Sequence, residues 1–220
     1  MKFLLFIFLT SILTLLKTQQ YGSFTDSRDG KTYSTFQVAG YDLFWMAENL
    51  STSKFRNGDN ISQARNAAEW RRAGEKKQPA WCYYNFDPTN EGKYGKLYNW
   101  FAVNDSRGIA PNGWHIPSIN EWENFIAIFK GQLFAGTYMK TSGWDGRDDG
   151  TNKSGFSALP GGYCSPFGSS YGVKLDGYWW SYSEKDEQNA WLITMNWNDT
   201  GVDIQPGGKK TGFSVRCVKD

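Results

Sequence analysis

Residues 113–129 read GWHIPSINEWENFIAIF, and they contain the clearest helix signal in the chain. Ser118 is followed three residues later by Glu121, a spacing that is typical of a capping box at the start of a helix. Pro117 ends the extended segment before this run, and Gly131 stops it. Large apolar side chains recur between them at helical spacing, at Trp122, Phe125, Ile126 and Phe129. The stretch therefore predicts an amphipathic helix docked on a core.

His115 lies just before this helix and is the only histidine in the protein. A Ser-His-Asp triad could only use this histidine. One histidine without a nearby cysteine also cannot supply a usual zinc site. We therefore expect His115 to be a partly buried imidazole that pins the chain, and we predict no catalytic residue and no enzymatic activity.

The composition favours one domain with a core of large rings. Aromatic residues make up 17% of the 220-residue chain, and such side chains bury much area and need partners for their polar tips. The net charge is +2, and two of the lysines, Lys2 and Lys17, lie in an N-terminal leader. The rest of the chain is near neutral and has no basic run, so we expect no nucleic-acid partner.

The leader, MKFLLFIFLTSILTLLK, has one early charge, Lys2, followed by an apolar run over residues 3–16. That run is too short for a stable membrane span and is typical of a secretory signal peptide. We expect a signal peptide at residues 1–20, a single domain at residues 21–220 and no transmembrane segment after cleavage. The predicted location is extracellular or in the cell envelope, and a retained anchor stays open because the cleavage site lacks A-x-A.

The first part of the body predicts a β-hairpin. Asp29 and Gly30 mark a turn, residues 33–38 alternate, and Gly40 marks a second turn before a partner run at residues 41–46.

The middle of the chain predicts one helix and one strand. Residues 62–77, SQARNAAEWRRAGEKK, suit a helix with Ser62 as its N-cap. Residues 80–85 suit a strand. Residues 96–105, KLYNWFAVND, fit either a short helix or a buried strand, because periodicity does not separate the two in so short a run.

The last third of the chain reads as short strands separated by turn residues. Its expected strands are residues 137–144, 155–162, 177–184, 190–197, 201–205 and 212–218. Together with the two helices, this order predicts an α+β fold with antiparallel sheets, two short flanking helices and long loops.

The three cysteines are Cys82, Cys164 and Cys217. Export would place them where disulfides persist. We expect Cys82 and Cys217 to pair, because both lie in apolar, strand-like runs and Cys164 lies in a turn-rich one. Such a bond would be worth about 4–5 kcal/mol in the chain-entropy model. Three reduced, buried cysteines are the alternative.

Some of the aromatic residues lie in apolar runs and others in polar, glycine-rich runs. We expect the first group to be core: Trp45, Trp81, Trp100, Trp114, Trp122 and Trp180. Exposed rings beside Asn, Asp and Ser are typical of a surface that binds sugars or proteins. The candidate ligand-binding residues are Tyr163, Tyr171, Tyr178, Trp179, Tyr182, Trp197 and Asn198, with Phe167 as a further exposed ring.

Seven ordered blocks resemble the Fibrobacter succinogenes major paralogous domain family, whose members are exported proteins of Bacteroidetes and related bacteria. The blocks are DGKTY, WMAENL, YGKLYNWFAV, GWHIPSINEWE, GFSALPGGY, WWSYSE and GFSVRCVKD, and they span the body of the chain. The resemblance implies a C-type-lectin-like fold, including its formylglycine-generating-enzyme branch. It also implies that the hairpin at residues 32–46 packs beside the last strand at residues 212–218.

The resemblance raises the question of calcium. Residues 145–152, DGRDDGTN, carry closely spaced oxygen ligands, and calcium takes six to eight oxygens, but the twelve-residue EF-hand pattern is missing. We expect no metal and no cofactor, with Asp145, Asp148 and Asp149 as the alternative calcium candidates. The tripeptide WND at residues 197–199 occurs in sugar-binding C-type lectins, but its upstream companion motif is missing here.

These observations predict a secreted or cell-surface binding module that recognises a glycan or a surface protein through aromatic-rich loops. The expected loops are residues 143–153, 163–178, 183–189 and 196–210. Two alternatives stay open. One is a structural or assembly component of the bacterial envelope, and the other is a formylglycine-generating-like enzyme.

Overall fold

The computed structural model describes residues 18–146 and 150–220. The predicted signal peptide falls almost wholly outside these ranges, and so do two of the three calcium candidates, Asp148 and Asp149.

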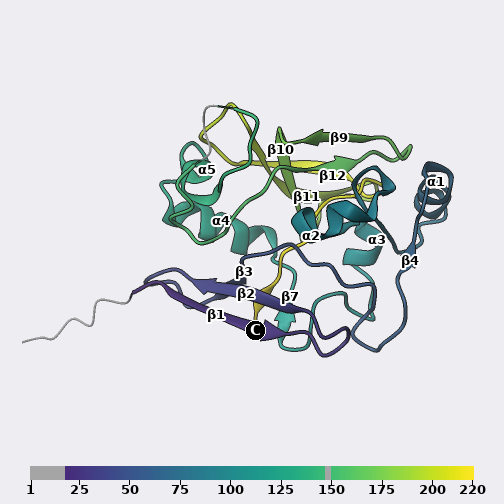
Figure 1. Ribbon diagram of the computed structural model, residues 1–220, viewed down its shortest axis with the longest axis horizontal. Helices are drawn as coiled ribbons and strands as arrows, with labels where there is room; N and C mark the ends of the chain where they lie inside the picture. The colour runs from purple at the N-terminus through teal and green to yellow at the C-terminus, as the bar shows by residue number, and fades with distance from the viewer. Residues whose placement is uncertain (1–17, 147–149) are drawn as a thin grey trace, which may run out of the picture.

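A five-stranded sheet brings the two ends of the described chain together (Figure 1). Its order is β1 (Gln20–Thr25), β2 (Thr32–Gln37), β3 (Phe44–Met46), β13 (Val218–Lys219) and β7 (Trp114–His115). The predicted hairpin is confirmed, since β2 pairs antiparallel with β3 and also with β1. Val218 lies opposite Trp45, so the expectation that the hairpin packs beside the last strand is confirmed as well.

Three smaller sheets are formed by the rest of the described residues. Strands β10 (Asp176–Glu184), β11 (Asn189–Asn196) and β12 (Asp203–Gly208) form an antiparallel meander, and β8 (Gly161–Cys164) pairs with β9 (Ser170–Val173). Strands β4 (Ser62–Gln63), β5 (Ala80–Cys82) and β6 (Leu97–Tyr98) form the third, in which β4 and β5 run parallel.

The helices are short and lie around these sheets. They are α1 (Ala67–Glu75), α2 (Glu91–Tyr94), α3 (Trp100–Val103), α4 (Ile119–Ile128) and α5 (Ala135–Met139), with 3-10 turns at η1 (Tyr84–Phe86) and η2 (Pro88–Asn90). The capping box predicted for α4 is present, because Ser118 accepts from the Glu121 N–H while the Glu121 carboxylate accepts from the Ser118 N–H. The fold is therefore α+β with mainly antiparallel sheets, as predicted.

Several predicted boundaries were wrong. The helix expected from Ser62 begins at Ala67 because Asn66 caps it, and residues 62–63 form a strand instead. Residues 137–144 were expected to be a strand, but α5 occupies their first part. In residues 96–105 both alternatives hold, since β6 is followed directly by α3 with Asn99 as its N-cap.

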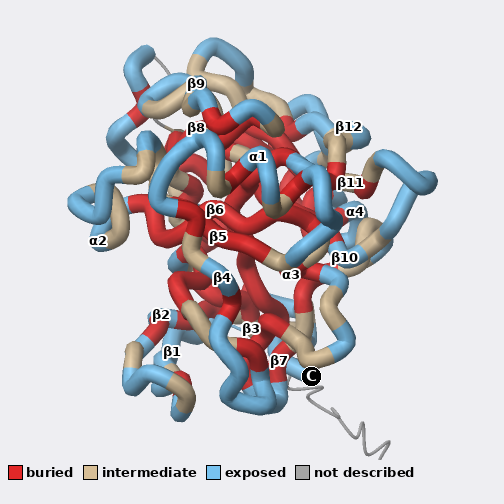
Figure 2. Tube along the Cα trace, turned by 90° about the vertical axis from the view of Figure 1, so that its right-hand side faces the viewer, coloured by how far each residue is buried: buried red, intermediate tan, exposed pale blue. Residues whose placement is uncertain are grey.

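The core is built from large rings, and the buried chain runs through the centre of the molecule (Figure 2). All six tryptophans predicted to be core are buried: Trp45, Trp81, Trp100, Trp114, Trp122 and Trp180. In the described ranges, no helix has both the length and the apolar content needed to cross a bilayer.

Candidate functional site

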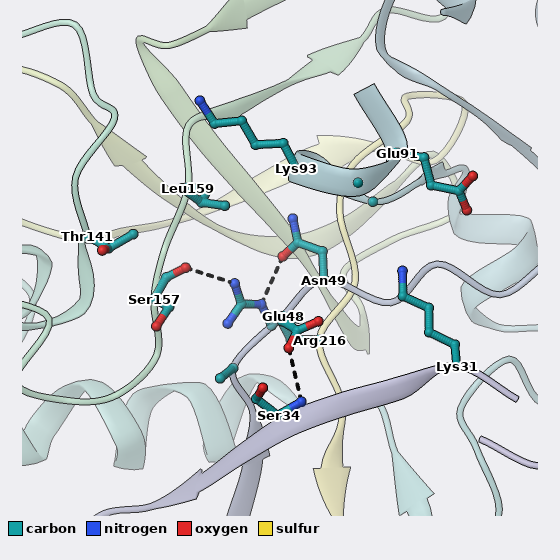
Figure 3. A pocket seen from close by; sticks show the side chains of 13 residues that line it. Lys31, Ser34, Glu48, Asn49, Glu91, Lys93, Thr141, Ser157, Leu159 and Arg216 are labelled. Carbon is teal, nitrogen blue, oxygen red and sulfur yellow. Dashed lines mark hydrogen bonds between the residues drawn. The ribbon is translucent and has the colours of Figure 1, made fainter. Parts of the chain in front are cut away.

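A polar pocket of about 260 Å³ lies between the five-stranded sheet and helix α2 (Figure 3). We call it the Arg216 pocket. Its walls come from six places in the chain, namely Lys31 and Ser34, residues 47–49, residues 91–95, Thr141, residues 157–159 and Arg216. Turns and strand ends supply most of them, because loops at the meeting of packed elements are where a fold can present polar groups.

Asn49 and Arg216 form the floor of this pocket. The Arg216 Nε donates to Asn49 Oδ1 at 2.8 Å, and the Trp179 indole N–H donates to the same oxygen at 2.9 Å. The Asn49 amide donates in turn to the Tyr94 carbonyl and to Ser214 Oγ. Every polar atom of this buried amide thus has a partner, which fixes its orientation and the position of the arginine.

The burial of Trp179 corrects a sequence prediction. It was expected to be an exposed ligand-binding ring, but its exposed fraction is 0%. The hydrogen bond to Asn49 gives its indole N–H a buried partner. The segment around Ser214 also lies along β10, where Ser214 forms a β-bridge with Trp179. Trp179 therefore supports the floor of the pocket from behind.

Arg216 is a buried cation whose described partners are neutral. Its exposed fraction is 1%, and its guanidinium donates to the carbonyls of Met46, Phe156 and Ser157 besides Asn49. Burial lowers the pKa of Arg216 to about 9, while the charge of Glu48 acts in the opposite direction. No carboxylate in the described ranges forms an ion pair with it, so positive charge in the floor stays unbalanced.

Glu91 stands on the wall of the pocket and is held by three donors. Its carboxylate accepts from Lys96 at 2.6 Å, from Ser51 at 2.7 Å and from Tyr83 at 2.8 Å. Burial alone would raise the pKa of Glu91, but these hydrogen bonds outweigh burial and lower it to about 2. The pKa of Lys96 is also lowered, because the ammonium is more deeply buried than the carboxylate and desolvation dominates there. Both lowered pKa values are consistent with a charged pair in which the Lys96 ammonium is more deeply buried than the Glu91 carboxylate.

The structure brings three of the predicted ligand-binding rings together. Tyr163 lies between Tyr171 and Tyr178, with ring centroids 5.6 Å and 5.1 Å away. Tyr171 is 51% exposed, and the other two rings are half-buried. Desolvation raises the pKa of Tyr178, and neighbouring Asp176 adds to that effect. We call this group the tyrosine cluster, and it begins four residues after Leu159 of the Arg216 pocket.

Tyr182 lies elsewhere, in a larger and more apolar hollow of about 420 Å³. We call it the His115 hollow, since His115, Glu121 and Tyr182 line it together with Arg56. Tyr182 is 52% exposed and lines this hollow.

His115 is held by two carboxylates. Its Nε2 lies 2.7 Å from Glu121 Oε1, and its Nδ1 lies 2.6 Å from Asp220 Oδ1. Burial alone would lower the pKa of His115, but the two carboxylates outweigh burial and raise it. A carboxylate at each nitrogen favours the protonated imidazole, and Glu121 also accepts from Ser118. His115 is therefore a partly buried imidazole that links the start of α4 to the C-terminal residue through its two hydrogen bonds, in line with the predicted role of holding the chain in place.

The remaining candidates are scattered. Trp197 is partly buried; it packs over Gly146 and against the hydrophobic core. Asn198 is exposed on the turn that follows β11. Asp145 is exposed, and in the described ranges no group of three or more His, Cys, Asp or Glu side chains is placed to hold a metal. The predicted single aromatic face is therefore divided among three places.

The predicted disulfide between Cys82 and Cys217 is not formed. All three cysteines are free thiols and buried. Cys217 lies in the core cluster around Tyr33 and Trp180, whereas Cys82 lies with Cys164 in a separate cluster around Trp70. The physical reason is topological, because Cys82 belongs to the β4–β5–β6 sheet and Cys217 directly precedes β13 of the five-stranded sheet. Burial raises the pKa of Cys217 to about 12, so this thiol is not an activated nucleophile.

Sequence reasoning missed the groups that form the pocket. Only one of them carried a signal, since Arg216 is a charge inside the apolar run FSVRCV, and such a charge needs buried partners. Nothing in their local sequence distinguishes Asn49, Lys31 or Lys93.

Comparison with known protein families gives a match. The model of the family described as the Fibrobacter succinogenes major domain matches residues 40–219, which confirms the resemblance seen in the sequence. Neither a curated protein nor a solved structure matches the chain. The matched range contains every wall of the Arg216 pocket except Lys31 and Ser34.

Proposed function

The chain belongs to the Fibrobacter succinogenes major domain family, and on that premise we propose that it is a secreted or cell-surface binding module without catalytic activity. Its ligand is a glycan bound in the Arg216 pocket, and the tyrosine cluster is a further contact surface. The scaffold we assign to it is C-type-lectin-like. The pairing of β13 with β3, which joins the two ends of the domain, supports that assignment.

The observation that carries this proposal is the mixture of groups around one open pocket. Cations, carboxylates and hydroxyls meet there, and the hydroxyls of Ser34, Thr141 and Ser157 add donors and acceptors. A concave site with a few convergent polar groups is the usual form of a small-ligand site. Its volume suits one sugar ring better than a long peptide, and the exposed face of Tyr171 offers apolar area for a second ring.

The absence of catalysis is supported by the state of the reactive side chains. His115 and Glu121 are bound to each other, and the thiols are buried. A formylglycine-generating-like reaction needs accessible sulfur, and each of these cysteines has an exposed fraction of 0%.

One observation favours the structural alternative. Leu133 and Phe134, in the turn between α4 and α5, are exposed apolar side chains next to partly exposed Ile128. Such a patch suits self-association. The exposed rings Phe167, Tyr171 and Tyr182 suit the binding module, because exposed aromatic rings offer contact area to a ligand.

The test is a binding screen with residues 20–220 against a glycan array and against bacterial surface proteins. We expect binding to a glycan that Tyr171→Ala weakens roughly tenfold, about the upper end of what one ring contact contributes. Tyr21→Ala is the matched control, since Tyr21 is an exposed tyrosine on β1. Binding to no glycan would refute the proposal, and binding only to a protein would replace the ligand class.

A further inference from the structure

We propose that the Arg216 pocket selects a sugar that carries a carboxylate, such as a uronic acid. This inference rests on the proposed function, because it names the ligand class of the same site.

The charges around the pocket do not balance. Arg216, Lys31 and Lys93 line it, and in the described part of the chain none of the three forms an ion pair with a carboxylate. Lys31 and Lys93 lie instead over the rings of Tyr33 and Tyr94, with Nζ 5.3 Å and 5.1 Å from the ring centroids. Both ammonium groups are thus held over aromatic rings while their charge stays available.

The two carboxylates of the pocket do not cancel these cations. Glu91 is already bound to Lys96, a cation that lies behind the wall. Glu48 accepts from the Ser34 backbone N–H and is exposed, so water screens its charge. Positive charge is therefore in excess, and a negative group in the pocket would neutralise it.

The same carboxylates argue for a sugar acid over a bare phosphate. A sugar acid uses more of this lining than a bare phosphate does, because its carboxylate can face the cations while its ring hydroxyls donate to Glu48 and Glu91. Figure 3 shows Glu48 beside Arg216 in the floor of the pocket and Lys31 below Glu91, while the Lys93 ammonium points away from Arg216.

The experiment compares polygalacturonate, hyaluronan and alginate oligosaccharides with their carboxyl-reduced forms on one array. We expect the acidic form of at least one pair to bind at least tenfold more tightly than the reduced form, and added salt to weaken it. Lys31→Met with Lys93→Met should remove most of this preference. Lys76→Met with Lys153→Met is the matched control, because both lysines are exposed outside the pocket.

The outcomes separate the two proposals. Glycan binding with no preference for the acidic form, or with a preference that the Lys31 and Lys93 variant keeps, would overturn the carboxylate inference and leave the binding module standing. No binding to any glycan would instead refute the proposed function on which the inference rests.

We also infer, from the packing of the cysteines, that Cys82 and Cys164 form a disulfide when the protein folds in an oxidising compartment. Both side chains are buried in one small cluster, with Ala64, Trp70, Ala80 and Leu97. Cys164 is the side chain with which the Cys82 thiol interacts, and Cys217 lies in another cluster. In the reaction both S–H bonds break, an S–S bond forms and two protons are released. The two electrons reduce the disulfide of a thiol–disulfide exchange partner.

This bond is tested by refolding the full chain in a glutathione redox buffer, then alkylating under denaturing conditions and mapping peptides by mass spectrometry. We expect one alkylated cysteine, Cys217, and a linked pair of peptides that contain Cys82 and Cys164. Cys217→Ala should leave the link in place. Three alkylated cysteines, or any bond to Cys217, would overturn the inference.

Discussion

Asn49 and Arg216 lie 167 positions apart in the sequence, yet they are joined by a 2.8 Å hydrogen bond from Nε to Oδ1 in the floor of the pocket. The bond connects the segment after β3 with the segment before β13, the two strands that bring the chain ends together. One buried amide therefore positions the cation and the tryptophan beneath the candidate site.

Asn49→Ala should destabilise the protein strongly. It would leave the Arg216 Nε and the Trp179 indole N–H without their buried acceptor, and we expect a loss of roughly 3–5 kcal/mol in the free energy of unfolding. Chemical denaturation measures this directly. Asn112→Ala, at an exposed position, should change stability little. Equal effects of the two substitutions would show that the amide does not hold the floor.

Glu91→Gln should flatten the acid dependence of stability. The carboxyl has a pKa of about 2 in the folded protein, below its ordinary value near 4.3, so its contribution is present above about pH 4.3 and is lost as the pH falls towards 2. Because the side chain is 35% exposed, solvent screening reduces the effect to about 1–2 kcal/mol. Denaturation curves between these pH values check it. Glu123→Gln, on the exposed side of α4, should keep the wild-type slope.

His115→Gln should change the pH dependence at the other end of the range. The folded pKa is raised above the ordinary value near 6.5, so the contribution of His115 is complete below about pH 6.5 and is lost as the pH rises through the raised pKa. The imidazole is 37% exposed, so we expect only about 0.5–1 kcal/mol after screening. Asp220→Asn removes one of its two carboxylate partners and should give an intermediate slope. A wild-type slope in the His115 variant would contradict this account.

Ser118→Ala should remove half of the capping box of α4 and cost about 1 kcal/mol. The measurement is thermal or chemical denaturation beside Ser106→Ala, since Ser106 is an exposed serine in a loop. If the two variants are equally stable, the cap does not contribute to the docking of this helix.

The elements that could be predicted were those whose signal is local. The capping box of α4 involves only residues 118–121, so the sequence of that segment is enough to predict it. A tryptophan within an apolar run is predicted to be buried from its immediate neighbours alone. The expectation for Trp179 failed because its partner, Asn49, lies 130 positions away, and the neighbouring glycine and tyrosine gave the run a polar character. The Arg216 pocket could not be predicted for the same reason, since its walls come from six separate places in the chain.

The disulfide prediction failed on topology. Cys82 and Cys217 occupy similar apolar runs, but sequence patterns do not say which sheet a strand joins. The place of Cys164 beside Cys82 follows from the bridge between Cys164 and Gly212, a contact that no local pattern indicates.

The most direct test of the account is an NMR titration of the protein with the tightest-binding uronate oligosaccharide from the array. The Trp179 indole N–H reports on the pocket floor because it donates to Asn49. We predict that its signal shifts with ligand concentration, and that the Lys31→Met and Lys93→Met variant loses this shift. A Trp179 signal that stays in place while signals around Tyr182 move would show that the ligand binds in the His115 hollow, and would contradict the account.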